Sequence, residues 1–243
     1  MRGRRVSDPF DRYAGDYEGA VERSIAFAHV GHEMFIKAKA RVLLHTVDRH
    51  LGTPGGKSFL DVGCGVGAMQ RYVAPVAGFS AGVDTSADSI EAAKMASPGS
   101  ALAAYEGSVL PYPDDRFDVT FAVNVVHHVD PPDRPTFAAE LARVTRPGGL
   151  VVVFEQNPLN PLTRLAVARC DFDEGVVLTG RSGVRRLLTG NGLGIVDARY
   201  VLFFPVDAGL ARRLEDFLGW LPLGAQHMVA GRKPQSNATT TTS

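Results

Sequence analysis

The sequence predicts an α/β protein with a parallel β-sheet that helices cover on both faces. Between residues 58 and 154, short apolar segments alternate with segments of helical periodicity, which is the pattern of successive β-α units. The apolar segments carry few polar residues, as is typical of strands that are buried on both faces. A glycine-rich turn follows the first of them, and turns at this edge of a parallel sheet bind ligands.

The expected elements follow from hydrophobic periodicity and turn residues. Helical periodicity over about residues 17–51 predicts two helices that are broken near Gly31. Ser86 is expected to cap a later helix, because its hydroxyl can accept a hydrogen bond from a free amide. The further strands are expected at 59–62, 81–84, 101–105, 117–123, 150–154, 194–204 and 226–231, and the further helices at 68–76, 86–95, 135–144, 182–188 and 208–218.

Length and composition favour one elaborated domain over two. The chain has 243 residues, of which 45% are hydrophobic, so it can bury a substantial core. Trp220 lies in an apolar stretch and is expected to be part of that core. Within the single domain over 1–234 we expect an N-terminal helical lid at about 8–52, a core at 57–154, a cap insertion at 155–181 and C-terminal strands and a helix at 182–234, followed by a disordered polar tail at 235–243.

Charge and cysteine content restrict the expected binding partners and cellular compartment of the protein. Lys+Arg and Asp+Glu both number 26, so no global field attracts nucleic acid or an anionic membrane. Cys64 and Cys170 are far apart in sequence, so no disulfide framework is expected and a reducing cytoplasm fits best. The sequence contains no run of about 18 apolar residues, so insertion into a membrane is not expected.

The glycine turn fits a dinucleotide-binding pattern. In FLDVGCGVG (59–67) and the residue after it, Gly63, Gly65 and Ala68 satisfy G-x-G-x-x-G/A. Asp84 lies 84 − 65 = 19 positions after Gly65, close to the ~20-residue spacing of an acid that binds a ribose. On these residues alone, NAD is a candidate ligand.

Longer stretches of the sequence point to a different nucleotide. Asp61 and Gly67 extend the turn to D-x-G-x-G-x-G, and GVDTS, LPYPDDRFDVTFAVNVVHHV and ELARVTRPGGLVVV follow it in order. Together these pieces resemble the class I methyltransferases that use S-adenosylmethionine (SAM). The resemblance implies a doubly wound, mostly parallel seven-stranded sheet of the Rossmann-like kind. PLGAQHMVAGRKP (222–234) is similar to the terminal antiparallel strand of that family.

The resemblance also implies which residues hold the methionine part of SAM. Gly63 and Gly65 let the cofactor approach the backbone amides, with Cys64 as the small residue between them. Asp61 orients the turn and helps to hold the ammonium group of SAM, although a role limited to backbone amides is the alternative. Asn124, which closes a strand, lends its backbone carbonyl to the same ammonium group.

Other residues are implied on the adenosine side. Asp84 accepts hydrogen bonds from both ribose hydroxyls, and Thr85 flanks the adenine. The family usually has an acid after the third strand, but this chain has Ser108, which makes a weaker bond, and Val109 offers its backbone N–H to the ring. Tyr17 belongs to an N-terminal segment that covers SAM in relatives, or else packs the first helix on the body.

Methyl transfer from a sulfonium needs mainly alignment of the reacting atoms and exclusion of water. A general base is needed only where the acceptor loses a proton. His127 and His128 follow a strand at the carboxyl edge, and imidazole titrates near neutral pH. We predict His128 as the base, with a structural role as the alternative. Acceptor-binding and turn-capping roles both stay open for Glu155, Asn157, Asn160, Arg164, Asp171 and Asp173 in the cap insertion.

The sequence thus predicts a SAM-dependent methyltransferase that acts on a small-molecule acceptor, such as a sugar, a lipid-linked intermediate or a secondary metabolite. An NAD(P)-dependent oxidoreductase is one alternative, and a SAM-binding protein without transferase activity is another. No metal is expected, since no Cys/His cluster has ligand spacing. The methylated atom and the oligomeric state stay open.

Overall fold

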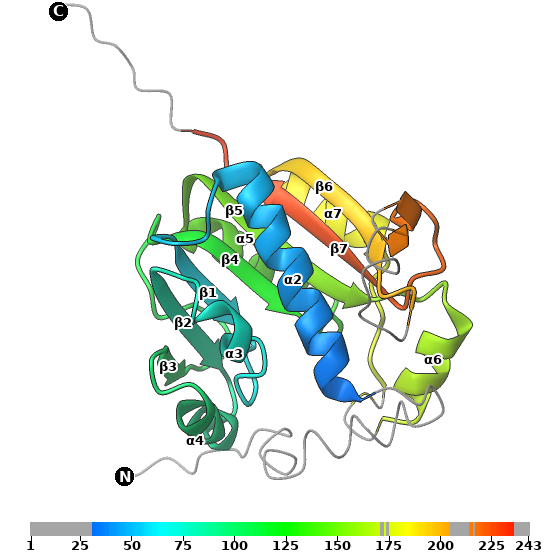
Figure 1. Ribbon diagram of the computed structural model, residues 1–243, viewed down its shortest axis with the longest axis horizontal. Helices are drawn as coiled ribbons and strands as arrows, with labels where there is room; N and C mark the ends of the chain where they lie inside the picture. The colour runs from blue at the N-terminus through cyan, green and yellow to red at the C-terminus, as the bar shows by residue number, and fades with distance from the viewer. Residues whose placement is uncertain (1–30, 171–172, 174, 205–213, 216, 236–243) are drawn as a thin grey trace, which may run out of the picture.

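The computed structural model describes residues 31–235 apart from 171–172, 174, 205–213 and 216. Seven strands form one sheet in the order β3-β2-β1-β4-β5-β7-β6 (Figure 1). Neighbours from β3 to β5 are parallel, while β7 runs antiparallel to both β5 and β6, as the resemblance implied. The strands are β1 (Ser58–Val62), β2 (Phe79–Asp84), β3 (Ala101–Ala104), β4 (Phe117–Val123), β5 (Thr145–Gln156), β6 (Gly194–Val201) and β7 (Gln226–Arg232).

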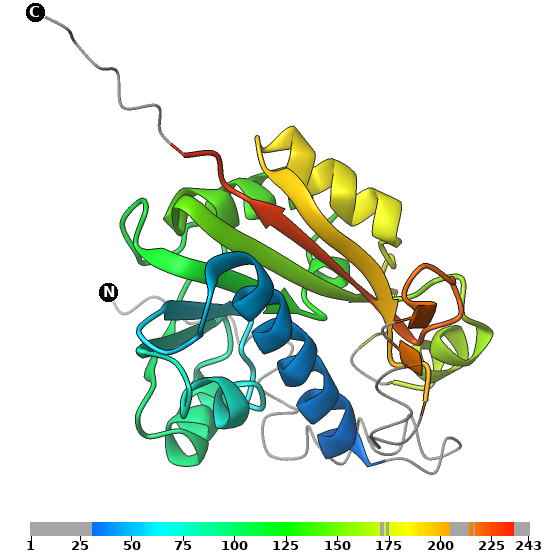
Figure 2. The ribbon, with the colours of Figure 1, turned by 45° about the horizontal axis from the view of Figure 1, so that its top comes forward.

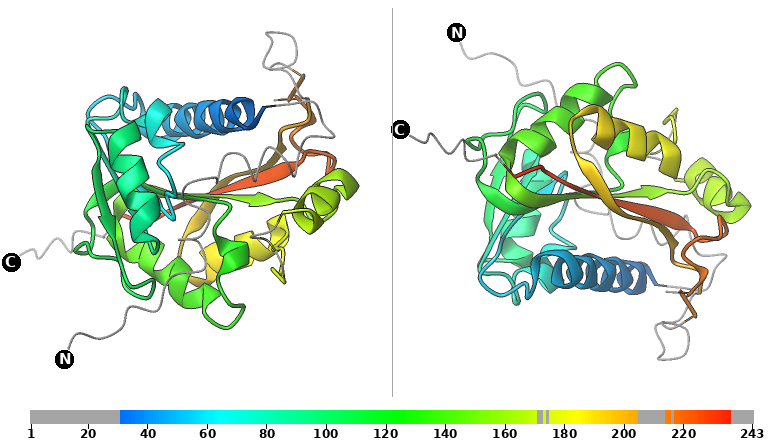
Figure 3. Two further views of the ribbon diagram at one scale, coloured as in Figure 1. Left: turned by 90° about the horizontal axis from the view of Figure 1, so that it is seen from below. Right: turned by 90° about the horizontal axis from the view of Figure 1, so that it is seen from above.

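Helices cover both faces of the sheet, as the apolar strands predicted. Figure 2 shows α2 lying across the sheet, and Figure 3 shows α5 and α7 on the opposite face. In β5, Val152 and Phe154 join the core cluster beneath α2, while Val151 and Val153 join the cluster beneath α5 and α7. The helices are α2 (His32–Leu51), α3 (Gln70–Val73), α4 (Ala87–Ala96), the 3-10 helix η3 (Val126–His128), α5 (Arg134–Val144), α6 (Pro161–Ala168) and α7 (Arg181–Gly190).

Most predicted elements are confirmed, but several of their ends differ, and the predicted strand at 194–204 already ends at Val201. The predicted helix at 68–76 contracts to Gln70–Val73. The predicted strand at 150–154 is longer, because pairing of Glu155 with His227 of β7 continues the ladder past the expected end. Glu155 is therefore part of the sheet and not of the cap insertion. Trp220 is 66% exposed, so the prediction of a core position was wrong.

Some predictions fall on residues outside the described part of the chain. These are Tyr17, Asp171, the first of the two N-terminal helices, most of the predicted helix at 208–218 and the tail. The predicted cap at Ser86 is confirmed, since its hydroxyl accepts a hydrogen bond from the Ser89 amide at 3.1 Å. Both cysteines are free and buried. Among the described helices, none has the length and apolar character needed to cross a membrane.

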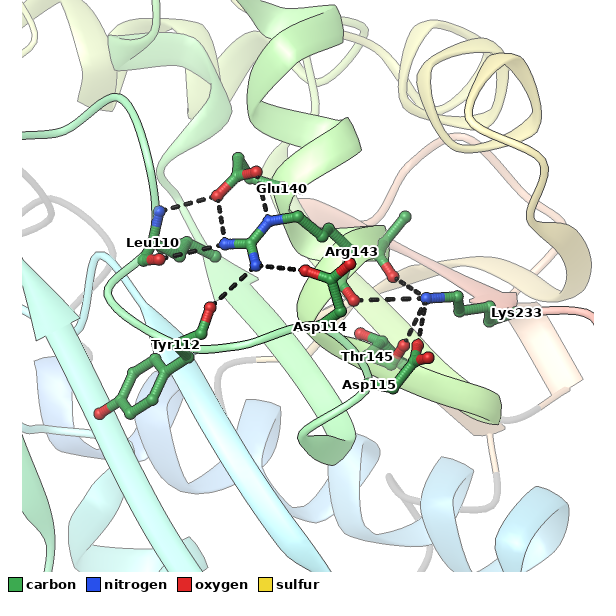
Figure 4. Close-up of polar contacts among 9 residues, drawn as sticks. Leu110, Tyr112, Asp114, Asp115, Glu140, Arg143, Thr145 and Lys233 are labelled. Carbon is green, nitrogen blue, oxygen red and sulfur yellow. Dashed lines mark hydrogen bonds and ion pairs between the residues drawn. The ribbon is translucent and has the colours of Figure 1, made fainter.

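One arginine fixes the long connection between β3 and β4 (Figure 4). The Arg143 guanidinium donates to the Glu140 carboxylate at 2.6 Å, to the Asp114 carboxylate at 2.8 Å and to the Tyr112 carbonyl at 2.8 Å. Glu140 in turn accepts the Leu110 amide at 2.8 Å. Because Ser108 and Val109 directly precede this anchored segment, α5 helps to position the predicted adenine-side residues.

Candidate functional site

The glycine turn after β1 takes a shape that side chains would oppose. Gly63 and Gly65 have φ values of 76° and 52°, in the left-handed region that favours glycine. A Cβ on Gly63 would lie only 2.5 Å from Cγ2 of Val125. Asp84, at the end of the neighbouring strand, accepts the Gly65 amide at 2.7 Å and so holds the turn in place.

The turn forms one wall of a cavity of about 460 Å³ at the carboxyl end of the sheet. The predicted cofactor residues that line it are Asp61, Gly63, Cys64, Gly65 and Asn124, and the predicted base His128 lines it as well. The opposite wall is largely apolar and includes Phe35, Ile36, Val167, Leu202 and Phe203. One wall of the cavity is therefore built by the backbone of the glycine turn, and another by these apolar side chains.

Two orphaned polar groups on the turn side suit the ammonium group of SAM. The Asp61 side chain is buried, and its Oδ1 has no hydrogen-bond partner among the described residues. Burial raises the pKa of Asp61 to about 8, and a bound cation would favour its ionised form. Asn124 has φ 58°, and its buried Oδ1 also lacks a partner within the described part of the chain. The residues present thus fit the cofactor that the sequence predicts.

Of the predicted adenosine-side residues, only Asp84 contacts the glycine turn. Asp84 accepts the amides of Gly65 and Ser86 at 2.7 and 3.0 Å. Thr85, Ser108 and Val109 are exposed and do not line the cavity. Their contacts with ribose and adenine therefore stay predictions.

A buried ion pair adjoins the cavity, which its histidine helps to line. The His127 ring donates from Nδ1 to Oε2 of Glu155 at 2.6 Å, and both side chains are almost fully enclosed. Glu155 also accepts the Val126 amide at 2.7 Å. Burial alone would lower the pKa of His127, but Glu155 and Asp173 outweigh it and raise that pKa to about 10. His127 is therefore an imidazolium at neutral pH.

His127 and His128 both line the cavity, but His128 is the more exposed of the two. Its side chain is 19% exposed, and its Nε2 lies 3.3 Å from Oδ1 of Asp173, which also lies 3.5 Å from His127 Nε2. Burial and the positive charge on His127 lower the pKa of His128 to about 4. His128 is thus neutral at physiological pH and can accept a proton, beside a carboxylate that would stabilise the resulting charge.

Part of the chain is similar in sequence to a known protein family. Residues 60–153 match the sequence profile of a family described as "Methyltransferase domain". Over these residues the chain is thus similar to methyltransferases. The match decides between the two nucleotides that the glycine turn left open, and the NAD(P) alternative is set aside.

Relatives of the methyltransferase core cover only part of the chain. This chain is 37% identical over 108 residues to a 2-methyl-6-phytyl-1,4-hydroquinone methyltransferase of Synechocystis sp.. It is 35% identical over 112 residues to a ubiquinone biosynthesis O-methyltransferase of Rhodopseudomonas palustris. These matches cover 43% and 45% of this chain, but only 33% and 43% of those proteins. The chain thus matches less than half the length of either relative.

Solved structures agree in fold over a longer stretch. A SAM-dependent methyltransferase from Thermotoga maritima superimposes with a TM-score of 0.64 at 19% identity, covering 92% of this chain and 98% of that one. The [4+2]-cyclase SpnF superimposes with a TM-score of 0.58 at 22% identity, covering 82% and 83%. At these identities the likeness shows the fold alone, and a cyclase shares it.

Two residues of the predicted cap insertion support the fold. Asn160 caps α6, where its Oδ1 accepts the amides of Leu162 and Thr163. Asn157 is buried and donates to the carbonyls of Pro222 and Gly224 at 3.1 and 2.8 Å. Their turn-capping interpretation is thus favoured over acceptor binding.

Lys39 is a cavity residue that the sequence analysis missed. It is 3% exposed, and burial lowers its pKa to about 8 although Glu155 and Asp61 act to raise it. A signal was present in the sequence, because Lys39 lies three residues after Ile36 and four before Leu43, on the buried stripe of α2. A lysine at such a position indicates a buried partner of opposite charge.

The tertiary structure also brings together a set of metal-binding side chains. Donor atoms of His127, His128 and Asp173 lie within 4.8 Å of one another, a grouping that sequence spacing did not reveal. However, His127 is held as an imidazolium between two carboxylates, and a protonated ring has no lone pair for a metal. The absence of a metal cofactor stays a prediction, which elemental analysis of the purified protein tests.

Proposed function

We propose that this protein transfers the methyl group of SAM to a hydroxyl group of a small molecule with an apolar body. The observation that carries the proposal is the position of neutral His128, which lines the same cavity as the glycine turn. A hydroxyl acceptor must lose a proton, and a neutral imidazole can take it. The free cysteines and the lack of a membrane-crossing helix among the described residues are compatible with the predicted cytoplasmic location.

SAM, when bound, supplies a methyl group on a positively charged sulfur, so the protein itself needs little covalent chemistry. Gly63 and Gly65 would present their backbone to the methionine part, and Asp61 would hold its ammonium group. Asp84, which already fixes the turn, would accept the ribose hydroxyls. The apolar wall of the cavity excludes water from the neighbourhood of the transferred group.

On the acceptor side, Asp173 orients the His128 ring through the contact at 3.3 Å. The His127–Glu155 pair lies behind it and keeps the Asp173 carboxylate beside a positive charge. As His128 takes the acceptor proton, the same carboxylate stabilises the imidazolium that forms. His128 is therefore the catalytic residue of the proposal, and Asp173 is a positioning residue.

The proposed acceptor class rests on the cavity wall and on the relatives. Phe35, Ile36, Leu202 and Phe203 offer an apolar surface, which suits an aromatic or prenylated phenol better than a free sugar. The printed names of the two relatives, a phytyl-hydroquinone methyltransferase and a ubiquinone biosynthesis O-methyltransferase, support a hydroquinone-like acceptor. Of the acceptor classes that the sequence predicted, the sugar is thereby disfavoured.

A second candidate is a SAM-binding protein that catalyses another reaction, since the [4+2]-cyclase SpnF shares the fold. Thermal unfolding with SAM, S-adenosylhomocysteine, NAD and NADP tests the shared premise, because ligands that bind the native state raise its stability. A shift with NAD and none with either SAM species would overturn both candidates.

Incubation with SAM carrying a deuterated methyl group and a panel of hydroquinones, phenols and sugars separates the two candidates. We expect mass spectrometry to find the deuterated methyl group on a hydroquinone or phenol oxygen. SAM binding without labelled product across the panel would favour the second candidate.

A further inference from the structure

Two amide side chains line the cavity where β5 leaves the sheet and β7 enters it. Gln156 is the last residue of β5, and Gln226 is the first residue of β7. The two residues lie directly opposite each other in the antiparallel ladder. Both line the cavity, and the proposed reaction has given neither of them a role. We call these two residues the amide pair.

The amide pair lies on the face of the sheet that α2 covers. Successive side chains of a strand point to opposite faces, so residues two apart share a face. Phe154 of β5 and Met228 of β7 belong to the core cluster beneath α2, and each lies two residues from a member of the amide pair. Directly opposite residues of such a ladder have Cβ atoms ~5 Å apart. The apolar layer beneath α2 therefore ends in two neighbouring amides at the cavity.

Gln226 is buried without a partner for its side-chain oxygen. The residue is 9% exposed, and its buried Oε1 accepts no hydrogen bond from any residue that the structure describes. An amide oxygen buried in this way destabilises the protein unless another molecule bonds to it. Since Gln226 also lines the cavity, that molecule can be a ligand. An amide carries both donors and acceptors, so a hydroxyl group or a carbonyl oxygen suits it.

The amide pair lies on the acceptor side of the cavity. The predicted cofactor residues Gly63, Gly65 and Asn124 follow β1 and β4, whereas β5 and β7 come next in the order of the sheet. Leu202 of the apolar wall directly follows β6, which pairs with β7. His128 follows β4, and β5 separates β4 from β7. An acceptor can therefore meet His128 and Gln226 from two different strands of one sheet edge.

We propose that the Gln226 amide binds a second oxygen on the ring of the acceptor, apart from the hydroxyl group that is methylated. His128 takes the proton of one hydroxyl group, while Gln226 holds the other oxygen by a hydrogen bond. A hydroquinone has two such oxygens on opposite sides of its ring, whereas a simple phenol has one. Gln226 is therefore a specificity-determining residue. This inference rests on the proposed function, because it requires a hydroxyl-bearing acceptor in the cavity.

The physical basis of the selectivity is the burial of the amide. A site that hydrogen-bonds a hydroxyl group rejects an analogue without it, because the polar group of the site is then left unpaired. At a buried amide this difference corresponds to at least about tenfold in affinity. The Gln156 amide is half-buried, so it gains less from a bond with a ligand and should contribute less to selectivity.

A binding experiment with two matched probes tests the proposal. Calorimetry under argon measures the affinity of the full chain, saturated with S-adenosylhomocysteine, for an alkylhydroquinone and for the alkylphenol that lacks one of its hydroxyl groups. We expect the alkylhydroquinone to bind at least about tenfold more tightly. The measurement involves no methyl transfer and no variant, so neither inactivity nor poor folding of a mutant can obscure it.

Variants then assign the selectivity to Gln226. Gln226→Met keeps the length of the side chain but removes its hydrogen bonds, so it should weaken alkylhydroquinone binding at least about tenfold and alkylphenol binding less than about twofold. Gln156→Met should weaken alkylhydroquinone binding about threefold. Gln235→Met is the matched control, because Gln235 is exposed and does not line the cavity, and it should change neither affinity.

Four results would overturn the proposal. Two of them concern the unaltered protein, namely equal affinity for the two probes and binding of neither probe. The third is an equal loss of both probes in Gln226→Met, which would assign Gln226 a packing role. The fourth is weaker binding of S-adenosylhomocysteine to that variant, which would place the amide beside the cofactor. Methyl transfer to phenols and hydroquinones alike would overturn this inference but not the proposed function, whereas selective binding without methyl transfer would do the reverse.

Discussion

The two walls of the cavity are built in different ways. The cofactor wall is formed by the backbone of one short turn, residues 61–65, which a single carboxylate from the next strand holds in place. The acceptor side depends on side chains from separate segments: His128 and Asp173 line the cavity, and the fully buried Glu155 supports them from beneath. A local motif therefore describes the first wall well, whereas the second exists only once the chain has folded.

Removing the buried charge at Glu155, on the acceptor side, should cause the largest loss of stability. Glu155→Gln is expected to lower the free energy of unfolding by about 3 kcal/mol, because it takes the main partner from the buried His127 imidazolium. Urea denaturation measures the loss. The control is Glu91→Gln, which breaks the exposed Glu91–Lys94 pair and should cost less than about 1 kcal/mol. Equal losses would contradict the assignment of a buried ion pair.

Substitution of His128 should lower the rate of methyl transfer without weakening the binding of SAM. His128→Gln is expected to lower kcat about 100-fold, as is typical of removing a general base, while the Kd for SAM stays within about twofold. Steady-state kinetics and calorimetry give the two values. His45→Gln, on the exposed face of α2, serves as the matched control. If His128→Gln keeps full activity, His128 has a structural role only.

Adding methyl groups to the turn tests the backbone-built wall. Gly63→Ala should cost about 2 kcal/mol of stability, because the left-handed backbone and the close approach to Val125 both oppose it. Gly65→Ala should cost about 1 kcal/mol, since it has the same backbone preference but open space around its Cβ. Thermal and urea unfolding compare the two variants. The reverse order would show that steric contact with Val125 does not constrain the turn.

The smallest expected effect is a pH dependence of SAM binding. Free Asp61, with its pKa raised by burial to about 8, is protonated at pH 6 to 7, and a bound ammonium group favours its carboxylate. Binding therefore releases a proton, so affinity should rise with pH by up to about tenfold per unit until about pH 8. Calorimetry in buffers of different ionisation enthalpy measures the released proton. Asp61→Asn should abolish the slope, and a slope that persists would assign the proton to another group.

Much of the fold could be predicted because its determinants are local. The apolar strands and the glycine turn at Gly63 and Gly65 are readable from the sequence, since left-handed backbone needs glycine and buried parallel strands need continuous apolar runs. Ser86 was identified as a cap for the same reason. The exposure of Trp220 was not predictable, because an apolar stretch has the same composition in a core and on a surface.

By itself, the sequence determined the α/β class, the order of the strands along the chain and the cofactor wall. Only the tertiary structure decided that Asp173 meets His128, that Lys39 is buried within the electrostatic influence of Glu155 and Asp61, and that Asn160 bonds to the Leu223 carbonyl. The physical reason is the separation along the chain over which each kind of interaction acts. Backbone preferences and caps act between residues close in sequence, whereas ion pairs between buried side chains and shared apolar surfaces depend on which distant segments the sheet brings together.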